Sequence, residues 1–306
     1  MDPSVQRCPA IVGPTAAGKT GLITSLAKQH NIEVISLDSR QIYHGLRIGT
    51  AQPSAAELEA CPHHLIDFVS PEEKYDAVRF RQDFARVYQE IIARGGQPIL
   101  VGGAGMYLTA LREGFMDIPG HSAERLAEVR QDLTKLSDEA IRQQLHDADP
   151  LSFRRIHTND RYRSQRALEI FQIAGETMTD LMAKQQPDPV LGLEFPAFIL
   201  ERPVEELDAR IDLRTGMMLE AGWLEETEAA LAVHPADCPG LKSIGYREIV
   251  QWLAGDITRE QLAPAIVLVT RQYAKRQRTM FRHLTAVGRW HPDSQELGRK
   301  IGPFLR

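Results

Sequence analysis

The sequence has few cysteines, no long apolar run and no excess of positive charge, and each shortage excludes a class of protein. Its three cysteines are Cys8, Cys61 and Cys238, and no two of them form a C-x-x-C pair. This spacing indicates neither a disulfide framework nor a zinc site. No stretch reaches the ~18 consecutive apolar residues of a membrane helix, and the N-terminus lacks the apolar run of a signal peptide. We therefore expect a cytoplasmic protein that does not contact membranes.

The formal net charge is −5, which excludes a protein that binds nucleic acid through its overall charge. Any such binding has to come from local basic patches. The length of 306 residues suffices for one large α/β domain with an insertion, or for two modest domains. The sequence contains no repeat or low-complexity tract, and we expect a monomer.

A glycine-rich loop near the N-terminus carries the clearest chemical signal. Residues 11–20 read IVGPTAAGKT and match the G-x-x-x-x-G-K-[ST] pattern that holds phosphate groups. The preceding AIVG predicts a buried strand, and GKTGLITSLAKQH predicts a helix whose N-terminus adds free N–H groups to an anion site. We expect Lys19 to neutralise the phosphate and the Thr20 hydroxyl to bind Mg²⁺, while the N–H groups of Thr15 to Thr20 surround the anion. The predicted phosphate-binding residues are Gly13, Pro14, Thr15, Ala16, Ala17, Gly18, Lys19 and Thr20.

Further apolar segments alternate with helical ones. The segments IEVISLDSR and QPILVGGAGMYL predict two more strands, and a helical segment around residues 72–94 lies between them. This order of strands and helices predicts an α/β fold with a P-loop-type parallel sheet. In such a sheet the ligand lies at the C-terminal ends of the strands.

The middle of the chain follows a different pattern. Beyond His121 the sequence is helical and strongly charged, with no apolar strand until EFPAFILERP. The segment after about Ala286 carries little pattern. We therefore predict a catalytic core made of residues 1–118 and 198–306, with a helical insertion domain over residues 119–197.

Phosphate binding alone does not imply ATP. The strand in ILVGGAG ends in glycines, where many P-loop ATPases carry a carboxylate that organises Mg²⁺. The nearby acid at a strand end is Asp38, in LDSRQIY. Asp38 could organise a metal or act as a general base, and an ordinary helix N-cap is the alternative.

Six blocks of the sequence resemble the tRNA dimethylallyltransferases, the tRNA isopentenyltransferase family. They occur in order from residue 13 to residue 282, and DSRQIYHGLRIGTAQP is the most distinctive. The blocks are GPTAAGKT, DSRQIYHGLRIGTAQP, HHLID, GGAGMYL, IHTNDRYRSQRALEIF and TRQYAKRQRTMFR. The resemblance implies transfer of a dimethylallyl group from dimethylallyl diphosphate to N6 of the adenine 3′ of the tRNA anticodon, with release of diphosphate. No zinc finger follows the last block, which is typical of the bacterial type.

The resemblance also implies roles for individual residues. Lys19 and Mg²⁺, which Thr20 would ligate, stabilise charge on the leaving diphosphate, and Asp38 accepts the proton of the adenine amine. The adenine has to leave its stack to reach this site. The implied tRNA-binding residues are Asp38, Ser39, Arg40, Gln41, Ala104, Arg163, Gln165, Arg166 and Arg278. A solvated helix start remains the alternative for Ser39 to Gln41, and a solvated, charged face remains the alternative for the two arginines at 163 and 166.

The last block predicts a basic stripe on one face of a helix. Arg271, Lys275, Arg278 and Arg282 recur at helical spacing with no acid between them. Such a stripe suits phosphate contacts, and whether it faces the diphosphate or the RNA stays open. Two residues depart from the family pattern, since Ala104 stands where the family usually has Thr, and Met280 where it usually has Trp.

Three other readings of the sequence compete with this one. A P-loop kinase of a small molecule or nucleotide would share the fold and the phosphate loop. An adenylate dimethylallyltransferase would use free AMP or ATP as the acceptor, but it would need neither the helical insertion nor the basic last block. An RNA-binding protein without catalysis would leave the complete phosphate loop and Asp38 unexplained.

Overall fold

The computed structural model describes residues 6–305. Within these residues the chain forms a six-stranded sheet with the order β3-β2-β4-β1-β5-β6, in which neighbouring strands pair in parallel. This arrangement confirms the predicted α/β fold with a parallel sheet. The strands are β1 (Ala10–Val12), β2 (Ile32–Leu37), β3 (His63–His64), β4 (Gln97–Gly102), β5 (Ala197–Leu200) and β6 (Gly288–Trp290).

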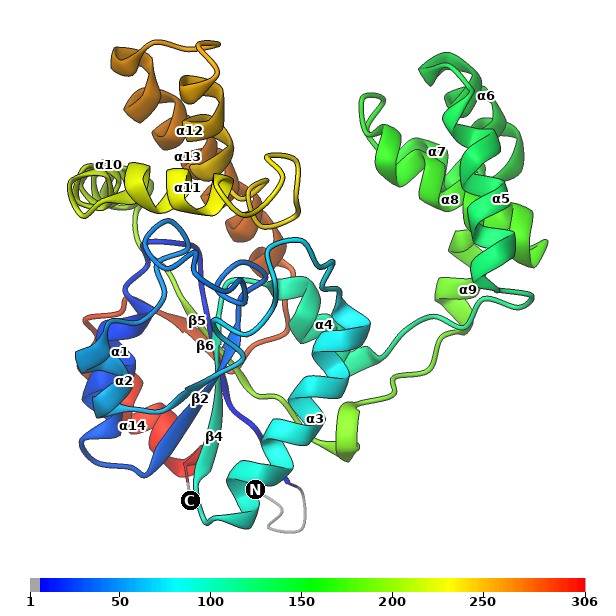
Figure 1. Ribbon diagram of the computed structural model, residues 1–306. Helices are drawn as coiled ribbons and strands as arrows, with labels where there is room; N and C mark the ends of the chain where they lie inside the picture. Colours follow the sequence, from blue (N-terminus) through cyan, green and yellow to red (C-terminus); the bar gives the residue numbers. More distant parts are fainter. Residues whose placement is uncertain (1–5, 306) are drawn as a thin grey trace. The chain divides into compact units, whose positions relative to one another are not determined.

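Helices cover both faces of the sheet (Figure 1). On one face lie α1 (Lys19–Ala27), α2 (Ala55–Ala60) and α14 (Gln295–Ile301), and on the other lie α3 (Ala77–Ala93) and α4 (Gly105–Glu113). A short 3₁₀ helix, η1, precedes β5 and another, η2, follows α14.

Strand side chains alternate between two hydrophobic cores, as period-two geometry requires. On β2, Ile35 and Leu37 join the cluster of Phe80 from α3, whereas Val34 joins the cluster of Ile23 from α1. The sheet is therefore buried on both faces, which explains why its strands read as continuous apolar runs.

Four more helices form a further helical layer beyond the C-terminal ends of the strands (Figure 1). They are α10 (Val204–Glu220), α11 (Trp223–Leu231), α12 (Tyr246–Leu253) and α13 (Arg259–Arg282). Their hydrophobic cluster includes Trp223, Tyr246 and Ile266 together with Ile42 and Leu46 from the segment after β2. This layer covers the end of the sheet at which the phosphate loop lies.

The segment after Ala286 contributes a strand and an α-helix that its weak sequence pattern does not predict. The strand β6 extends one edge of the sheet, and α14 buries Leu297 and Ile301 completely. Both elements are short, so neither offers a long periodic pattern.

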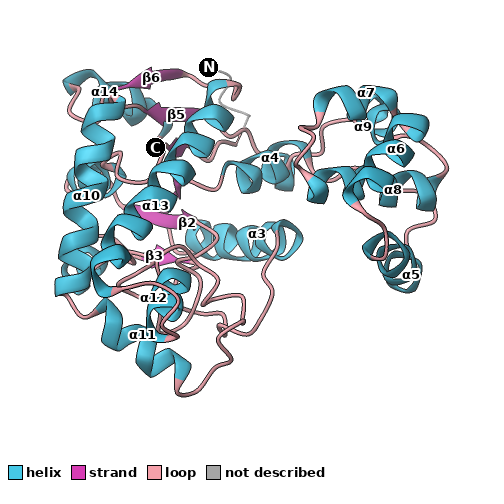
Figure 2. Cartoon of the chain, turned by 90° about the horizontal axis from the view of Figure 1, so that it is seen from above, coloured by secondary structure: helices cyan, strands magenta, loops and turns pink. Residues whose placement is uncertain are grey.

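Glu113–Asp188 forms a second compact unit, and the rest of the chain forms the larger one. The predicted core ranges 1–118 and 198–306 include residues 1–5 and 306, which lie outside the described residues. Helices and loops alone build the smaller unit (Figure 2). Its helices are α5 (Ala123–Thr134), α6 (Asp138–Ala148), α7 (Pro150–Arg155), α8 (Arg161–Ala174) and α9 (Met178–Lys184).

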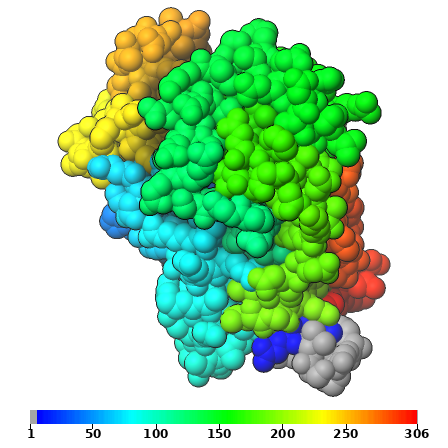
Figure 3. Space-filling model, turned by 90° about the vertical axis from the view of Figure 1, so that its right-hand side faces the viewer, coloured from blue at the N-terminus to red at the C-terminus, as the bar shows by residue number. Residues whose placement is uncertain are grey.

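The smaller unit has a hydrophobic core of its own. Leu133, Ile141, Leu145 and Leu168 are buried in one cluster drawn from α5, α6 and α8. Figure 3 shows one face of this unit, in green, as a continuous packed surface. A compact helical unit with its own core presents charged side chains from defined positions on each helix.

Candidate active site

The two glycines of the phosphate loop are needed for different reasons. A Cβ on Gly13 would lie 2.7 Å from the backbone oxygen of Leu200 on β5, so only glycine allows the loop to leave the sheet this closely. Gly18 has a φ of 98°, in the left-handed region, and leads directly into α1. The loop is thereby folded so that the start of α1 faces the space that the loop surrounds.

The ammonium of Lys19 lies over the phosphate loop. Its Nζ donates hydrogen bonds of 2.9 Å to the backbone oxygens of Gly13 and Pro14. Burial, the largest cause, lowers the pKa of Lys19 to about 8, while Asp38 opposes this shift and Arg214 adds to it. A lysine held in this way is a cation without a strong counter-ion, which favours an anionic ligand.

Side chains from distant parts of the sequence hold the loop in place. The N–H of Thr15 donates to Gln277 Oε1 at 2.9 Å, and Gln277 Nε2 donates to the Gly103 oxygen at 3.1 Å. Arg210 Nε donates to the Ala16 oxygen at 2.8 Å. Within the predicted run from Thr15 to Thr20, the Thr15 N–H therefore already binds a side chain of α13, and the Ala17 N–H donates to the Pro14 oxygen at 3.3 Å.

Two arginines of α10 add positive charge beside Lys19. Arg210 and Arg214 lie one helical turn apart, and Arg214 Nη1 lies 3.4 Å from the Thr15 hydroxyl. Burial lowers the pKa of Arg214, and Asp38 opposes that shift. The sequence alone does not single out these two arginines, because a basic pair on a charged helix is equally typical of a solvated face.

A single cavity of about 870 Å³ brings the chemistry-bearing side chains of the larger unit together. The phosphate loop lines one side of it, and the segment after β2 lines another. The predicted site residues that line it are Thr15, Ala16, Gly18, Lys19, Thr20, Asp38, Ser39, Arg40 and Gln41. Gly13, Pro14 and Ala17 are buried within the loop itself.

Asp38 follows the last residue of β2 and starts a turn. Its Oδ1 accepts hydrogen bonds from the N–H groups of Arg40 at 2.8 Å and Gln41 at 3.3 Å. No helix begins here, so the helix N-cap alternative is wrong, although the carboxylate makes the same kind of backbone contact. Within the described chain Oδ2 accepts no hydrogen bond, and one carboxylate oxygen is therefore available to a ligand.

The residues after Asp38 are fixed by side-chain amides. Gln41 Nε2 donates to the Ala51 oxygen at 2.8 Å, and Gln41 Oε1 accepts from Ser36 at 3.0 Å. Arg40 donates to the Pro239 oxygen at 3.2 Å. The segment therefore forms a defined wall of the cavity rather than a mobile loop surface.

Five predicted tRNA-binding residues are not among those that line this cavity. In the larger unit, Ala104 packs against the core cluster beside α4, and Arg278 lies on α13 without lining the cavity. In the smaller unit, Arg163, Gln165 and Arg166 lie on α8.

The contacts of these α8 residues differ. The Arg163 side chain is 74% exposed, with Asp160 at 3.5 Å. Gln165 Nε2 donates to the Leu133 oxygen at 3.4 Å. Arg166 donates to the buried Glu169 at 2.9 Å, and Arg130 binds the same carboxylate.

The predicted basic stripe of α13 needs a correction. Arg271 binds Asp212 at 2.7 Å and lies 3.6 Å from Asp208, both on α10, so it joins two helices instead of forming part of a free stripe. Tyr273, Arg276 and Gln277 line the cavity in its place. The spacing correctly predicts a helix over this segment. Which of its basic side chains are available to a ligand depends on ion pairs with residues far away in the sequence.

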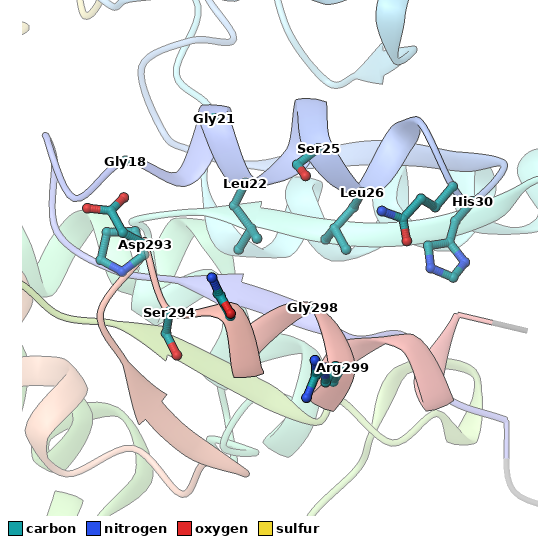
Figure 4. Close-up of a pocket in the computed structure, with 13 residues that line it drawn as sticks. Gly18, Gly21, Leu22, Ser25, Leu26, His30, Asp293, Ser294, Gly298 and Arg299 are labelled. Carbon is teal, nitrogen blue, oxygen red and sulfur yellow. The ribbon is translucent and has the colours of Figure 1, made fainter.

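A second hollow of about 580 Å³ lies between α1 and residues 292–299 (Figure 4). His30 on the α1 side and Arg299 on α14 line it, together with Gly18 from the phosphate loop. It contains neither Lys19 nor Asp38, and we therefore assign the chemistry to the larger cavity.

The side chains that could ligate a metal ion in this cavity are few. Among residues 6–305 no group of three or more His, Cys, Asp or Glu side chains could hold a metal ion. The exposed Thr20 hydroxyl and the Asp38 carboxylate both line the cavity. This sparse oxygen set fits Mg²⁺, which keeps several waters and takes further ligands from substrate phosphates.

Among residues 6–305, every helix is too short or too polar to span a membrane.

Comparisons with known proteins match nearly the whole chain. A family model described as IPP transferase matches residues 41–284, and one described as isopentenyl transferase matches residues 6–73. A full-length tRNA isopentenylpyrophosphate transferase from Bacillus halodurans is 32% identical, with a TM-score of 0.70 over 98% of this chain and 97% of that one. The corresponding transferase from Staphylococcus epidermidis is 29% identical, with a TM-score of 0.67 over 97% and 98% of the two chains. A eukaryotic dimethylallyltransferase acting on tRNA is 29% identical, with a TM-score of 0.74 over 89% of this chain and 69% of that one.

Proposed function

Because the chain belongs to the IPP transferase family, as its sequence blocks predict, we propose that it transfers a dimethylallyl group from dimethylallyl diphosphate to a tRNA. The acceptor we propose is N6 of the adenine 3′ of the anticodon. One observation supports this reaction above all others. A phosphate loop with a partly buried lysine and a strand-end carboxylate face the same cavity, so a diphosphate-binding group and a proton acceptor can act on one substrate pair.

In the proposed reaction the bond between C1 of the allyl group and the diphosphate oxygen breaks. Its electron pair stays on the leaving diphosphate, and the N6 lone pair forms the new carbon–nitrogen bond. Lys19, Arg210 and Arg214 stabilise the charge that grows on the leaving group, because preorganised cations act most strongly where charge develops. The proton that N6 loses passes to the free oxygen of Asp38.

We propose that Mg²⁺ assists the diphosphate in this site. The Thr20 hydroxyl and, through water, the Asp38 carboxylate would hold the ion, with diphosphate oxygens as its other ligands. When bound, Mg²⁺ supplies neutralising positive charge to the leaving group.

On the tRNA side we propose two sets of contacts. Ser39, Arg40 and Gln41 contact the extruded adenine and its neighbours from the wall of the cavity. The basic and amide side chains of α8, together with Arg278, contact the anticodon stem-loop. We expect a monomeric cytoplasmic enzyme.

The test offers labelled dimethylallyl diphosphate with tRNA, AMP or ATP in separate reactions. We expect label in tRNA alone, with Mg²⁺ required and ATP dispensable. The matched control is the same tRNA with guanine in place of the adenine 3′ of the anticodon, which should stay unlabelled. Label in AMP or ATP would identify an adenylate dimethylallyltransferase instead, and phosphoryl transfer from ATP would identify a kinase.

A further inference from the structure

A carboxylate outside the cavity binds three successive backbone N–H groups of the segment that follows Asp38. Glu226 on α11 accepts from the N–H of Arg47 at 2.8 Å, from Ile48 at 2.8 and 3.1 Å, and from Gly49 at 3.2 Å. Consecutive N–H groups that point to one anion form a concave site whose backbone shape depends on that anion. Here the anion is part of the protein and lies 177 or more residues away in sequence.

The Tyr246 hydroxyl completes this contact. It donates to Glu226 Oε1 and accepts the Gly49 N–H at 3.0 Å. Burial and the adjacent Glu226 raise the pKa of Tyr246, so its hydroxyl stays neutral and keeps its donor proton.

Gly49 fits tightly between two aromatic rings. A Cβ built on Gly49 would lie 2.0 Å from Trp223 Nε1 and 2.4 Å from Tyr246 Cε2. Both aromatic side chains are buried, so neither can move aside easily. Steric fit and hydrogen bonds thus hold the same residue at the same place.

The segment held in this way forms a wall of the cavity. Gly49, Thr50, Ala51 and Gln52 line it, whereas Glu226 does not. Gln41, the third residue after Asp38, binds the Ala51 oxygen. This hydrogen bond links the segment that Glu226 holds to the residues next to the Asp38 carboxylate. No hydrogen bond or ion pair joins Glu226 to the phosphate loop within the described residues.

From this arrangement we infer that Glu226 is a positioning residue for the acceptor side of the cavity. It fixes the wall that receives the acceptor base and leaves the diphosphate side unaffected. The inference rests on the proposed function, because it assumes that a tRNA base enters beside Gln41 and Ala51. It predicts a selective effect: loss of Glu226 weakens use of the acceptor, not of the allylic diphosphate.

The experiment measures kcat and both KM values for Glu226→Ala, Glu226→Gln and Gly49→Ala. The matched control is Glu225→Ala, which removes an exposed carboxylate from the next position of α11. For Glu226→Ala and Gly49→Ala we expect the KM for tRNA to rise about tenfold, the scale of one lost hydrogen bond to a charged group. The KM for dimethylallyl diphosphate should stay within about twofold of the wild-type value in the same variants, because Glu226 makes no hydrogen bond or ion pair with the phosphate loop. Glu226→Gln keeps an acceptor oxygen and should fall between wild type and Glu226→Ala.

Amide hydrogen exchange tests the same inference without substrates. Residues 47–49 should exchange faster in Glu226→Ala than in wild type or Glu225→Ala, while the helix α1 keeps its protection. Equal rises in both KM values, or unchanged KM for tRNA with unchanged exchange at 47–49, would overturn the inference. Wild-type protein that transfers nothing to tRNA would instead overturn the proposed function, and the exchange result would still decide whether Glu226 fixes the segment.

Discussion

Two sets of cations, one in each compact unit, are held in different ways. In the larger unit, Lys19, Arg210 and Arg214 bind backbone or hydroxyl oxygens and form no ion pair among the described residues. In the smaller unit, Arg163 and Arg166 each lie beside an acid, Asp160 or Glu169. Cations without an acidic partner around a loop create a positive potential that attracts an anion. The charges of Arg163, which is exposed, and Arg166, which is partly buried, are instead offset by their acidic partners until a polyanion competes for them. The larger unit should therefore control chemistry, and the smaller one affinity.

Asp38 is the acid nearest in effect to Lys19 and Arg214, since it favours the charged form of both. Its substitution should lower the rate of transfer more than any other change. Asp38→Asn keeps the hydrogen bond of Oδ1 to the Arg40 and Gln41 N–H groups but cannot accept the N6 proton. We expect single-turnover transfer to fall by about 10²–10⁴-fold, the usual worth of a general base. Binding of tRNA should change little. Transfer at the wild-type rate would reduce Asp38 to a turn residue.

Lys19→Ala removes one of the three unpaired cations. We expect kcat to fall by about 10²-fold or more, the scale of losing one preorganised stabiliser of developing charge. Omitting Mg²⁺ should lower transfer comparably. The control is Lys28→Ala, an exposed lysine at the other end of α1. A Lys19 variant as active as this control would contradict the assignment of the loop to the diphosphate.

The pH dependence tests the same cation without changing its shape. Burial lowers the pKa of Lys19 to about 8, so the ammonium is present below that pH and is lost above it. We expect kcat/KM for dimethylallyl diphosphate to fall about tenfold per pH unit above pH 8, because this parameter reports the free enzyme. Bound diphosphate favours the charged form, so kcat should stay level to higher pH. A profile of kcat/KM that stays flat to pH 10 would contradict a lowered pKa of Lys19 in the free enzyme.

These effects also separate what the sequence reveals from what it does not. The phosphate loop is local: its strand, its two glycines and its helix follow one another, and the pattern specifies all three. Asp38 was identifiable for the same reason, because it directly follows an apolar strand.

The supports of the site come from far along the chain. Thr15 and Gln277 lie 262 positions apart, and Ala16 and Arg210 lie 194 apart. Nothing in the helical pattern of α10 distinguishes Arg210 and Arg214, which bind the loop, from arginines on a solvated face. Conversely, Arg271 fits the predicted basic stripe by spacing, but its acidic partners on α10 could not be foreseen from spacing alone.

Changing the paired arginines of the smaller unit should affect affinity rather than turnover. The double variant Arg163→Glu and Arg166→Gln avoids placing a second acid against the buried Glu169. We expect tRNA binding to weaken severalfold and the slope of log Kd against log salt to decrease by about one per lost phosphate contact. The control, Arg86→Glu, changes an exposed arginine of α3 that is also paired with acids. An unchanged salt slope in the double variant would assign α8 to the solvated surface.

A change that touches neither set of cations should have the smallest effect, and Ala104→Thr is such a change. Ala104 directly precedes α4 and accepts the N–H of Tyr107 at 2.9 Å. Threonine there could cap the N–H of residue 106 or 107, which is worth about 1 kcal/mol of stability. Since Ala104 lies against the core cluster, the added methyl opposes part of this gain. Urea unfolding should therefore give a free energy of unfolding about 0.5–1 kcal/mol higher than wild type, with turnover changed less than about twofold.

Ala104→Val, which has the same shape as threonine without the oxygen, separates capping from packing. If valine raises the free energy of unfolding as much as threonine does, the increase comes from packing, and the explanation by capping is wrong.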